Sequence, residues 1–319
     1  MSIATRPAQK APVGTGLVLV ALLVVYVVWG STYLAIRVTV REAPPLMGMG
    51  SRYLAAGLLL GLVIGSRIGF RQLLVSRREL AGCAFIGLML PVLGNGVVAL
   101  GESKGTPSGV AALLVALTPL MIMVFRLISG DRPRRTTLGG VGVGFAGVAY
   151  LVLAGSDSGT DSLPLGPSLL ILFACTCWAF GSWVQPRLVL PDNAFVMTVH
   201  EMWTGGVVLL VFGLLRGEHL SPGDYHAKTW LAWSYLVVFG SMLAFTAYVW
   251  LLANAPISLV ATYAYVNPVV AVVLGALILS EPVTVAVLVG GGIIVAGVAI
   301  VISVERPRKV GVQPKAGIT

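Results

Sequence analysis

The most prominent pattern in the chain is a series of long apolar stretches separated by short polar segments. A helix that spans a membrane needs about 20 consecutive, mostly apolar residues, and ten stretches meet this requirement. They cover residues 17–36, 45–66, 79–100, 106–128, 138–154, 165–188, 194–215, 229–252, 257–279 and 283–303. Arg6 and Lys10 precede the first stretch, but it is too long for a signal-peptide core and no A-x-A cleavage site follows it. The pattern predicts an all-α integral membrane protein with ten transmembrane helices.

Composition strengthens this interpretation. Of the 319 residues, 57% are hydrophobic and only 10% are charged, with a mean hydropathy of +0.94. An ordinary soluble domain has about 25% charged residues to cover its surface. A typical soluble enzyme, a disordered chain and a nucleic-acid-binding protein are therefore excluded, although the net charge is +9.

The positive charges instead predict the orientation in the membrane. Ten spans place both termini on one side, and the segments on that side contain 15 Lys and Arg residues, against 5 on the other side. Lys and Arg are enriched in cytoplasmic segments, so we expect both termini in the cytoplasm. The predicted organisation is a cytoplasmic tail (1–16), two five-helix repeats (17–154 and 165–303) joined by a linker (155–164), and a second cytoplasmic tail (304–319).

The division into two repeats follows from an internal duplication. Three prolines recur after 149 residues, and one of these pairs lies in the segments Thr118-Pro119-Leu120 and Asn267-Pro268-Val269. Trp29 and Trp178 are also 149 residues apart. Five spans are an odd number, so the two repeats enter the membrane from opposite sides. Such inverted-topology repeats are common in secondary transporters, which bind substrate near the midplane between the repeats.

Two charged residues in the spans are candidates for substrate contact. Arg52 and Glu201 are 149 residues apart and therefore occupy equivalent helices. A charge at the centre of a spanning helix costs about 2.5–3.5 kcal/mol to insert, so it normally faces a cavity or a partner. The alternative is a structural contact with backbone or neighbouring polar groups. His200 is a candidate proton-sensitive group, and a packing role for it is the alternative.

Uncharged candidates are Asn95 and a set of aromatic side chains. The Asn95 amide can both donate and accept hydrogen bonds, which suits a zwitterion, although an interhelical hydrogen bond would also account for it. Rings that line a cavity would contact apolar groups or an ammonium. The aromatic candidates are Tyr26, Trp29, Tyr33, Trp178, Tyr248 and Tyr263.

Pro119 and Pro268 are expected inside equivalent helices. Each proline frees the carbonyl four residues earlier, at Val115 and Ala264, and can provide a hinge. A static kink, with the carbonyl satisfied by a neighbouring hydroxyl, is the alternative. Glu102 lies near a helix end and is expected at the membrane interface, and a role as a gate is the alternative.

Several motifs suggest other functions but lack the required context. Gly101-Glu102-Ser103-Lys104-Gly105 fits G-x-S-x-G, but the segment joins two membrane helices and no catalytic residues are expected. The glycines at 142, 144 and 147 fit the dinucleotide pattern without a preceding strand, and there is no P-loop. The three cysteines form no C-x-x-C pair. We expect no enzyme activity, no cofactor and no metal.

The chain resembles the drug/metabolite transporter superfamily, specifically the ten-helix EamA group. The residues that carry the resemblance are Trp29 to Tyr33, Arg52-Tyr53, Ser108 to Pro119, Trp178-Ala179, Pro268 and Ser280-Glu281-Pro282. The resemblance implies a bacterial inner-membrane exporter of amino acids or related small metabolites that works by alternating access.

Alternatives remain open for the function and the partners. A carrier of lipophilic drugs or nucleotide-sugar-like metabolites is possible within the same class, and an intramembrane enzyme or scaffold is the alternative from another class. Proton coupling and facilitated diffusion both remain open. The expected partners are a small-molecule substrate and membrane lipid, without nucleic acid, and the chain is expected to be a monomer or a weak homodimer.

Overall fold

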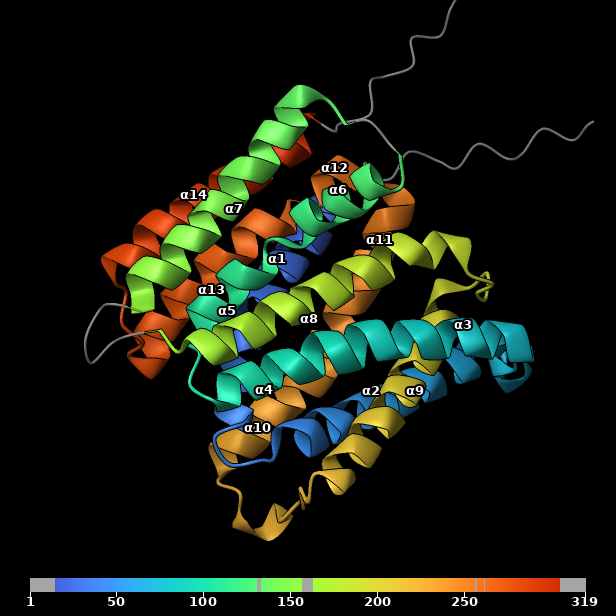
Figure 1. Cartoon of the computed structure of the whole chain (residues 1–319). Helices are drawn as coiled ribbons and strands as arrows, with labels where there is room; N and C mark the ends of the chain where they lie inside the picture. The colour runs from blue at the N-terminus through green and yellow to red at the C-terminus, as the bar shows by residue number, and fades with distance from the viewer. Residues whose placement is uncertain (1–14, 131–132, 157–162, 256, 261, 305–319) are drawn as a thin grey trace, which may run out of the picture.

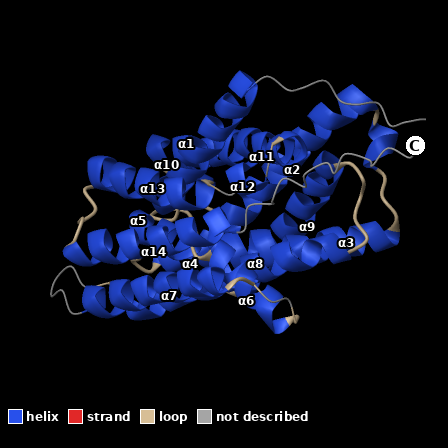
Figure 2. Cartoon of the chain, turned by 90° about the horizontal axis from the view of Figure 1, so that it is seen from above, coloured by secondary structure: helices blue, strands red, loops and turns tan. Residues whose placement is uncertain are grey.

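A computed structural model describes residues 15–130, 133–156, 163–255, 257–260 and 262–304. Every described element is a helix or a connecting loop (Figure 2). We call the end of the bundle where α1 begins and α14 ends the terminal end, and the opposite end the distal end (Figure 1). The predicted tails and the linker fall largely outside the described residues.

The first repeat contains seven α-helices. Their bounds are α1 (Thr15–Thr39), α2 (Pro45–Ile68), α3 (Arg77–Gly87), α4 (Val97–Ser103), α5 (Ser108–Val115), α6 (Thr118–Ile128) and α7 (Arg135–Ser156), with a π-helical segment η2 (Leu88–Gly96) between α3 and α4 and a 3-10 turn η1 (Phe70–Leu73).

The second repeat has the same order of elements. Its helices are α8 (Leu165–Val184), α9 (Ala194–Leu215), α10 (Ala227–Tyr235), α11 (Ala244–Asn254), α12 (Ile257–Val260), α13 (Tyr263–Leu279) and α14 (Val285–Val304), with a π-helical segment η6 (Leu236–Leu243) and 3-10 turns η4 (Gln185–Arg187) and η5 (Pro222–Asp224).

The prediction of ten spans is confirmed to within a few residues at most ends. Within the described ranges, nine continuous helical segments are long and apolar enough to cross a membrane, and the 17-residue α13, preceded by the short α12, supplies the tenth pass. Exposed apolar side chains such as Leu277 and Leu153 are expected, because the outer surface of such a bundle faces lipid rather than water.

The repeats pack through equivalent helices. Helix α2 lies against α9, while α7 and α14 pair on one side of the bundle (Figure 1). At the α7–α14 contact, a Cβ atom on Gly297 would lie 2.7 Å from the Gly144 Cα atom, so only glycine permits this approach. Small residues thus bring the backbones together where the apolar lipid provides no hydrophobic driving force.

Candidate functional site

A central cavity lies between the two repeats. Its wall is formed by α1, α2, η2, α4, α5 and α6 of the first repeat and by α8, α9, η6, α11 and α13 of the second, but not by the α7–α14 pair. Most of the wall is apolar, and polar side chains enter it at Thr32, Tyr33, Arg52, Asn95, Thr118, Thr198, Glu201, Ser241 and Asn267. A mostly apolar pocket with a few convergent polar groups is the usual form of a small-molecule site.

Arg52 and Glu201 both line this cavity and are both 4% exposed. The Arg52 Nε donates to the Ser241 hydroxyl at 3.1 Å, and its Nη1 contacts the Met49 sulfur at 3.6 Å. Among the described residues, no carboxylate forms an ion pair with Arg52. The Glu201 Oε1 atom is buried without a hydrogen-bond partner in the described structure. A basic and an acidic side chain therefore face one space without forming an ion pair with each other.

Asn95 lies in the π-helical segment η2 and lines the cavity. Tyr53, the neighbour of Arg52, lines the same cavity. The ring of Trp178 packs against Gly94, where a Cβ atom would stand 2.7 Å from a ring carbon. The π segments η2 and η6 both line the cavity, which agrees with the frequent occurrence of such turns at functional sites.

Three aromatic rings surround Trp29. Its ring lies 4.9 Å from that of Tyr248, 5.3 Å from Tyr263 and 6.3 Å from Phe245, measured between centroids. Trp29 Nε1 donates to the Gly240 carbonyl at 3.3 Å, in the second repeat. Trp29 and Tyr263 line the cavity, whereas Tyr248 lies behind them and is not among the lining residues.

The helix that contains Pro119 is interrupted before the proline. Helix α5 ends at Val115, and Pro119 lies in the first turn of α6. Main-chain N–H groups in the first turn have no partner within the helix, so the missing N–H of proline costs no hydrogen bond there. Pro119 thus lies inside the spanning segment Ser108–Ile128, as expected, at a break between two helical stretches. The Val115 carbonyl accepts a hydrogen bond from the Thr118 hydroxyl at 2.7 Å, so a neighbouring hydroxyl satisfies it, as the kink alternative predicts. Pro268 lies inside α13 and lines the cavity.

Two further candidates lie outside the cavity lining. The Tyr26 hydroxyl bonds to that of Thr262, which links α1 to the start of α13. The His200 Nε2 atom lies 2.8 Å from the Leu73 carbonyl, in the packing role that was the alternative for this residue. Glu102 is fully buried, and Arg37 donates a hydrogen bond to its main-chain oxygen. The depth of Glu102 in the membrane stays a prediction.

The sequence analysis did not propose five of the polar lining residues for the cavity, namely Thr32, Thr118, Thr198, Ser241 and Asn267. Asn267 is 6% exposed, and its amide nitrogen, in the orientation that satisfies it, donates to the main-chain oxygens of Tyr263 at 3.3 Å and Tyr26 at 3.2 Å. The 149-residue shift that pairs Thr118 with Asn267 was a usable signal, because both residues line the cavity. Ser241 had no signal, since a single serine in an apolar run usually packs against backbone.

Inverted helical repeats around a central cavity define the class of a membrane transporter. The EamA-like transporter family model matches residues 15–153 and 166–303, one match for each repeat. The chain belongs to the EamA-like transporter family, and the resemblance found in the sequence is confirmed. It is a membrane transporter of small molecules and not an enzyme. Among the described residues, no group of three or more His, Cys, Asp or Glu side chains could hold a metal ion.

Similar proteins carry transporter names. The Escherichia coli K12 "Uncharacterized inner membrane transporter YedA" is 41% identical over 255 residues, which are 80% of each chain. The Salmonella typhimurium "Probable amino-acid metabolite efflux pump" is 26% identical over 91% of this chain and 95% of its own. The Streptantibioticus cattleyicolor "Probable terminal-alkyne amino-acid exporter" is 25% identical over 88% and 92%. A solved structure titled "Crystal structure of protein" matches with a TM-score of 0.62 and 18% identity, over 90% of this chain and 96% of that one, and supports the fold alone.

Proposed function

We propose that this chain exports amino acids or related small metabolites across the bacterial inner membrane by alternating access. The observation that carries the proposal is the pair Arg52 and Glu201, which line one cavity without forming an ion pair with each other. A zwitterion presents one carboxylate and one ammonium, and these match a guanidinium and a carboxylate. The names of two relatives, an amino-acid metabolite efflux pump and an amino-acid exporter, point in the same direction.

In this proposal each cavity wall has a role. Arg52 binds the substrate carboxylate, Glu201 and Asn95 bind the ammonium, and Trp29, Trp178 and Tyr263 contact an apolar side chain. The two repeats, 17–154 and 165–303, rock about this site, with Pro119 and Pro268 near the points where the helices bend. One chain forms the cavity, so one chain is the transport unit, either as a monomer or within a weak homodimer.

The test is transport by purified protein in proteoliposomes. We expect saturable flux of a radiolabelled amino acid, and competition by an excess of the same unlabelled compound. An imposed pH gradient distinguishes the two coupling modes. It should change the flux if transport is coupled to protons and leave the flux unchanged if transport is facilitated diffusion. Flux of a lipophilic cation with no saturable flux of any amino acid would overturn the proposal in favour of the drug-carrier alternative.

The proposed orientation places both termini in the cytoplasm, and the bias of 15 against 5 positive residues supports it. A C-terminal green fluorescent protein fusion should fluoresce in bacterial cells, while an alkaline phosphatase fusion at the same point should be inactive. An active phosphatase fusion would contradict this orientation.

A further inference from the structure

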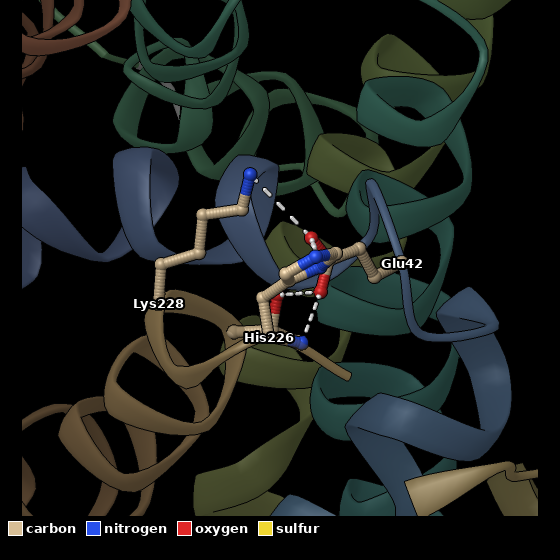
Figure 3. Close-up of polar contacts among 4 residues, drawn as sticks. Glu42, His226 and Lys228 are labelled. Atoms are coloured by element: carbon tan, nitrogen blue, oxygen red, sulfur yellow. Dashed lines mark hydrogen bonds and ion pairs between the residues drawn. The ribbon is translucent and has the colours of Figure 1, made fainter. Parts of the chain in front are cut away.

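Three glutamates connect the two repeats at the distal end, outside the cavity lining. The first is Glu42, in the loop between α1 and α2. Its Oε2 accepts hydrogen bonds from the His226 main-chain N–H at 2.9 Å and the Thr229 hydroxyl at 2.6 Å, at the start of α10 (Figure 3). Its Oε1 lies 3.0 Å from His226 Nδ1 and 3.5 Å from Lys228 Nζ. A carboxylate of the first repeat therefore caps a helix of the second.

The second is Glu218, which follows α9. Its Oε2 accepts hydrogen bonds from the main-chain N–H groups of Leu46 at 3.0 Å and Met47 at 2.9 Å, in the first turn of α2. Here a carboxylate of the second repeat caps a helix of the first.

The third is Glu281, from the Ser280-Glu281-Pro282 segment that follows α13. Its Oε1 accepts from the Ser108 N–H at 2.9 Å, and its Oε2 accepts from the Ser108 hydroxyl at 2.8 Å and the Gly109 N–H at 3.3 Å, at the start of α5. Ser280 has a positive φ of 53°, which is unusual for a residue other than glycine and turns the chain back after α13. A Cβ atom on Gly275 would overlap Glu281 Oε2, so the approach requires glycine at 275.

The three helices capped in this way have no side-chain cap of their own. The residues at their N-cap positions are Pro44 for α2, Pro107 for α5 and His226 for α10, and none donates or accepts a capping bond through its side chain. The first main-chain N–H groups of a helix need acceptors, and a carboxylate there is further favoured by the helix dipole. At the distal end, these acceptors come from the opposite repeat.

Two of the helices that begin at the terminal end, α3 and α9, are capped differently. Ser76 and Glu79 form a capping box on α3, within the first repeat. Asn193 accepts hydrogen bonds from Phe195 and Val196 at the start of α9, within the second. Each of these two helices is therefore satisfied by its own repeat.

The sequence shows the same difference between the two ends. A shift of 149 residues pairs Glu218 with Gly69 and Glu281 with Arg132, which lies outside the described residues. The same shift pairs Glu42 with Pro191. The duplicated chain therefore has no acid at the terminal-end counterpart of any of the three glutamates.

We propose that Glu42, Glu218 and Glu281 form a distal latch that fastens the two repeats together, and that the cavity opens toward the distal side only when these bonds are released. The proposal rests on alternating access as proposed above, and it adds that the terminal end, where α3 and α9 are capped within their own repeats, opens more readily. The latch contacts are made by backbone N–H groups and hydroxyls, and the one lysine among them, Lys228, is exposed. The two repeats can therefore separate without leaving a buried charge pair.

The experiment measures spin-label distances in purified full-length protein in lipid nanodiscs, without substrate. In a background with Cys83, Cys175 and Cys177 replaced by Ala, one pair of labels is placed at the exposed distal positions Lys104 and Arg216. A second pair, at the exposed positions Ser129 and Asp192, reports on the terminal end. Each pair joins the two repeats.

We expect the triple variant Glu42→Gln, Glu218→Gln, Glu281→Gln to add a longer-distance population to the distal pair. Each substitution should raise the ratio of open to closed forms by about fivefold to tenfold, because a charge-assisted hydrogen bond is roughly twice as strong as a neutral one. The terminal pair should not lengthen. Glu79→Gln is the matched control, since it changes a capping carboxylate within one repeat and should leave both distances unchanged.

A second variant keeps all three carboxylates. Gly275→Ala should displace Glu281 and lengthen the distal distance, whereas Gly292→Ala should not, because no atom lies within 4 Å of a Cβ at that position. An unchanged distal distribution in both the triple variant and Gly275→Ala, with folded protein on gel filtration, would overturn the latch. The measurement needs no substrate, so a failure to transport amino acids would leave its outcome unaffected.

Discussion

Helices α2 and α9 are equivalent elements of the two repeats, yet they present opposite charges to the same cavity. Both are long, glycine-containing helices that pack against each other, and their charged residues Arg52 and Glu201 are 149 residues apart. Arg52 has a hydroxyl partner, Ser241, whereas one oxygen of Glu201 has none. The duplication preserved the scaffold, while the side chains in the cavity diverged. The two repeats therefore share their backbone arrangement, while the residues that would bind a substrate differ between them.

The largest expected effect comes from removing the positive member of the pair. Arg52→Ala should reduce transport efficiency by about 10- to 100-fold, because a hydrogen bond to a charged group contributes about 1.5–3 kcal/mol. Initial rates in proteoliposomes measure this. Arg216→Ala, at an exposed arginine after α9, is the control and should transport normally. Equal transport rates for the two variants would show that Arg52 does not bind the substrate.

Neutralising Glu201 tests the contact with the ammonium end of the substrate separately from the contact with its carboxylate end. Glu201→Gln should weaken binding of an amino acid by about 10-fold, since one charge-assisted hydrogen bond is lost. Binding of the N-acetylated derivative, which has no ammonium, should not change. Calorimetric titration of both compounds tests this, and equal losses for both would assign Glu201 a structural role.

A smaller effect is expected where the two repeats differ without charge. Asn267→Thr copies the equivalent residue, Thr118, and removes the amide that bonds to the Tyr26 and Tyr263 carbonyls. The loss of neutral hydrogen bonds should cost about 0.5–1.5 kcal/mol each. Thermal unfolding should occur at a lower temperature than in the wild type. The control variant Thr176→Ser, which keeps a hydroxyl at this position in α8, should lower it less.

The smallest effect concerns pH at the distal end. Hydrogen bonds from the Thr229 hydroxyl, and then from the His226 N–H and ring, lower the pKa of Glu42 to about 2. A carboxyl group whose pKa is lowered on folding stabilises the fold above its unfolded pKa of about 4.3, and the stabilisation is lost as the pH falls through the folded value. The difference in unfolding temperature between wild type and Glu42→Gln should therefore stay constant from about pH 8 to about pH 5 and shrink only below that range.

Two neighbours could disturb this prediction. His226 faces Glu42 from α10, and Lys228 lies 3.5 Å from the same carboxylate. A change in the stability difference between about pH 8 and about pH 6 would show that a group other than the Glu42 carboxylate contributes to the contact. His226→Gln, measured over the same range, identifies that contribution.

The fold followed from the sequence because its strongest signals are long and periodic. Ten apolar stretches and a constant 149-residue offset are properties of the whole chain, so no single residue decides them. The central position of Arg52, Glu201, Asn95 and Trp29 followed as well, since a charged or strongly polar side chain in an apolar span needs a polar environment.

The remaining details depend on contacts that hydropathy does not encode. His200 and Tyr26 have chemistry that suits a cavity, but neighbouring helices supply their partners, Leu73 and Thr262. The interruption before Pro119 arises from the local geometry between α5 and α6. The burial of Glu102 could not be foreseen, because its position near a helix end is also compatible with the interface.

The two π-helical segments bear on the history of the gene. A π turn in an α-helix corresponds to one inserted residue, and η2 and η6 begin at Leu88 and Leu236, a separation of 148 residues that nearly equals the repeat offset. An insertion shared by both copies at the same place is most simply explained if it occurred in a single ancestral five-helix gene. That gene's product would have had to pair with a second copy of itself in opposite orientation, so the cavity would be older than the fusion that joined its two halves.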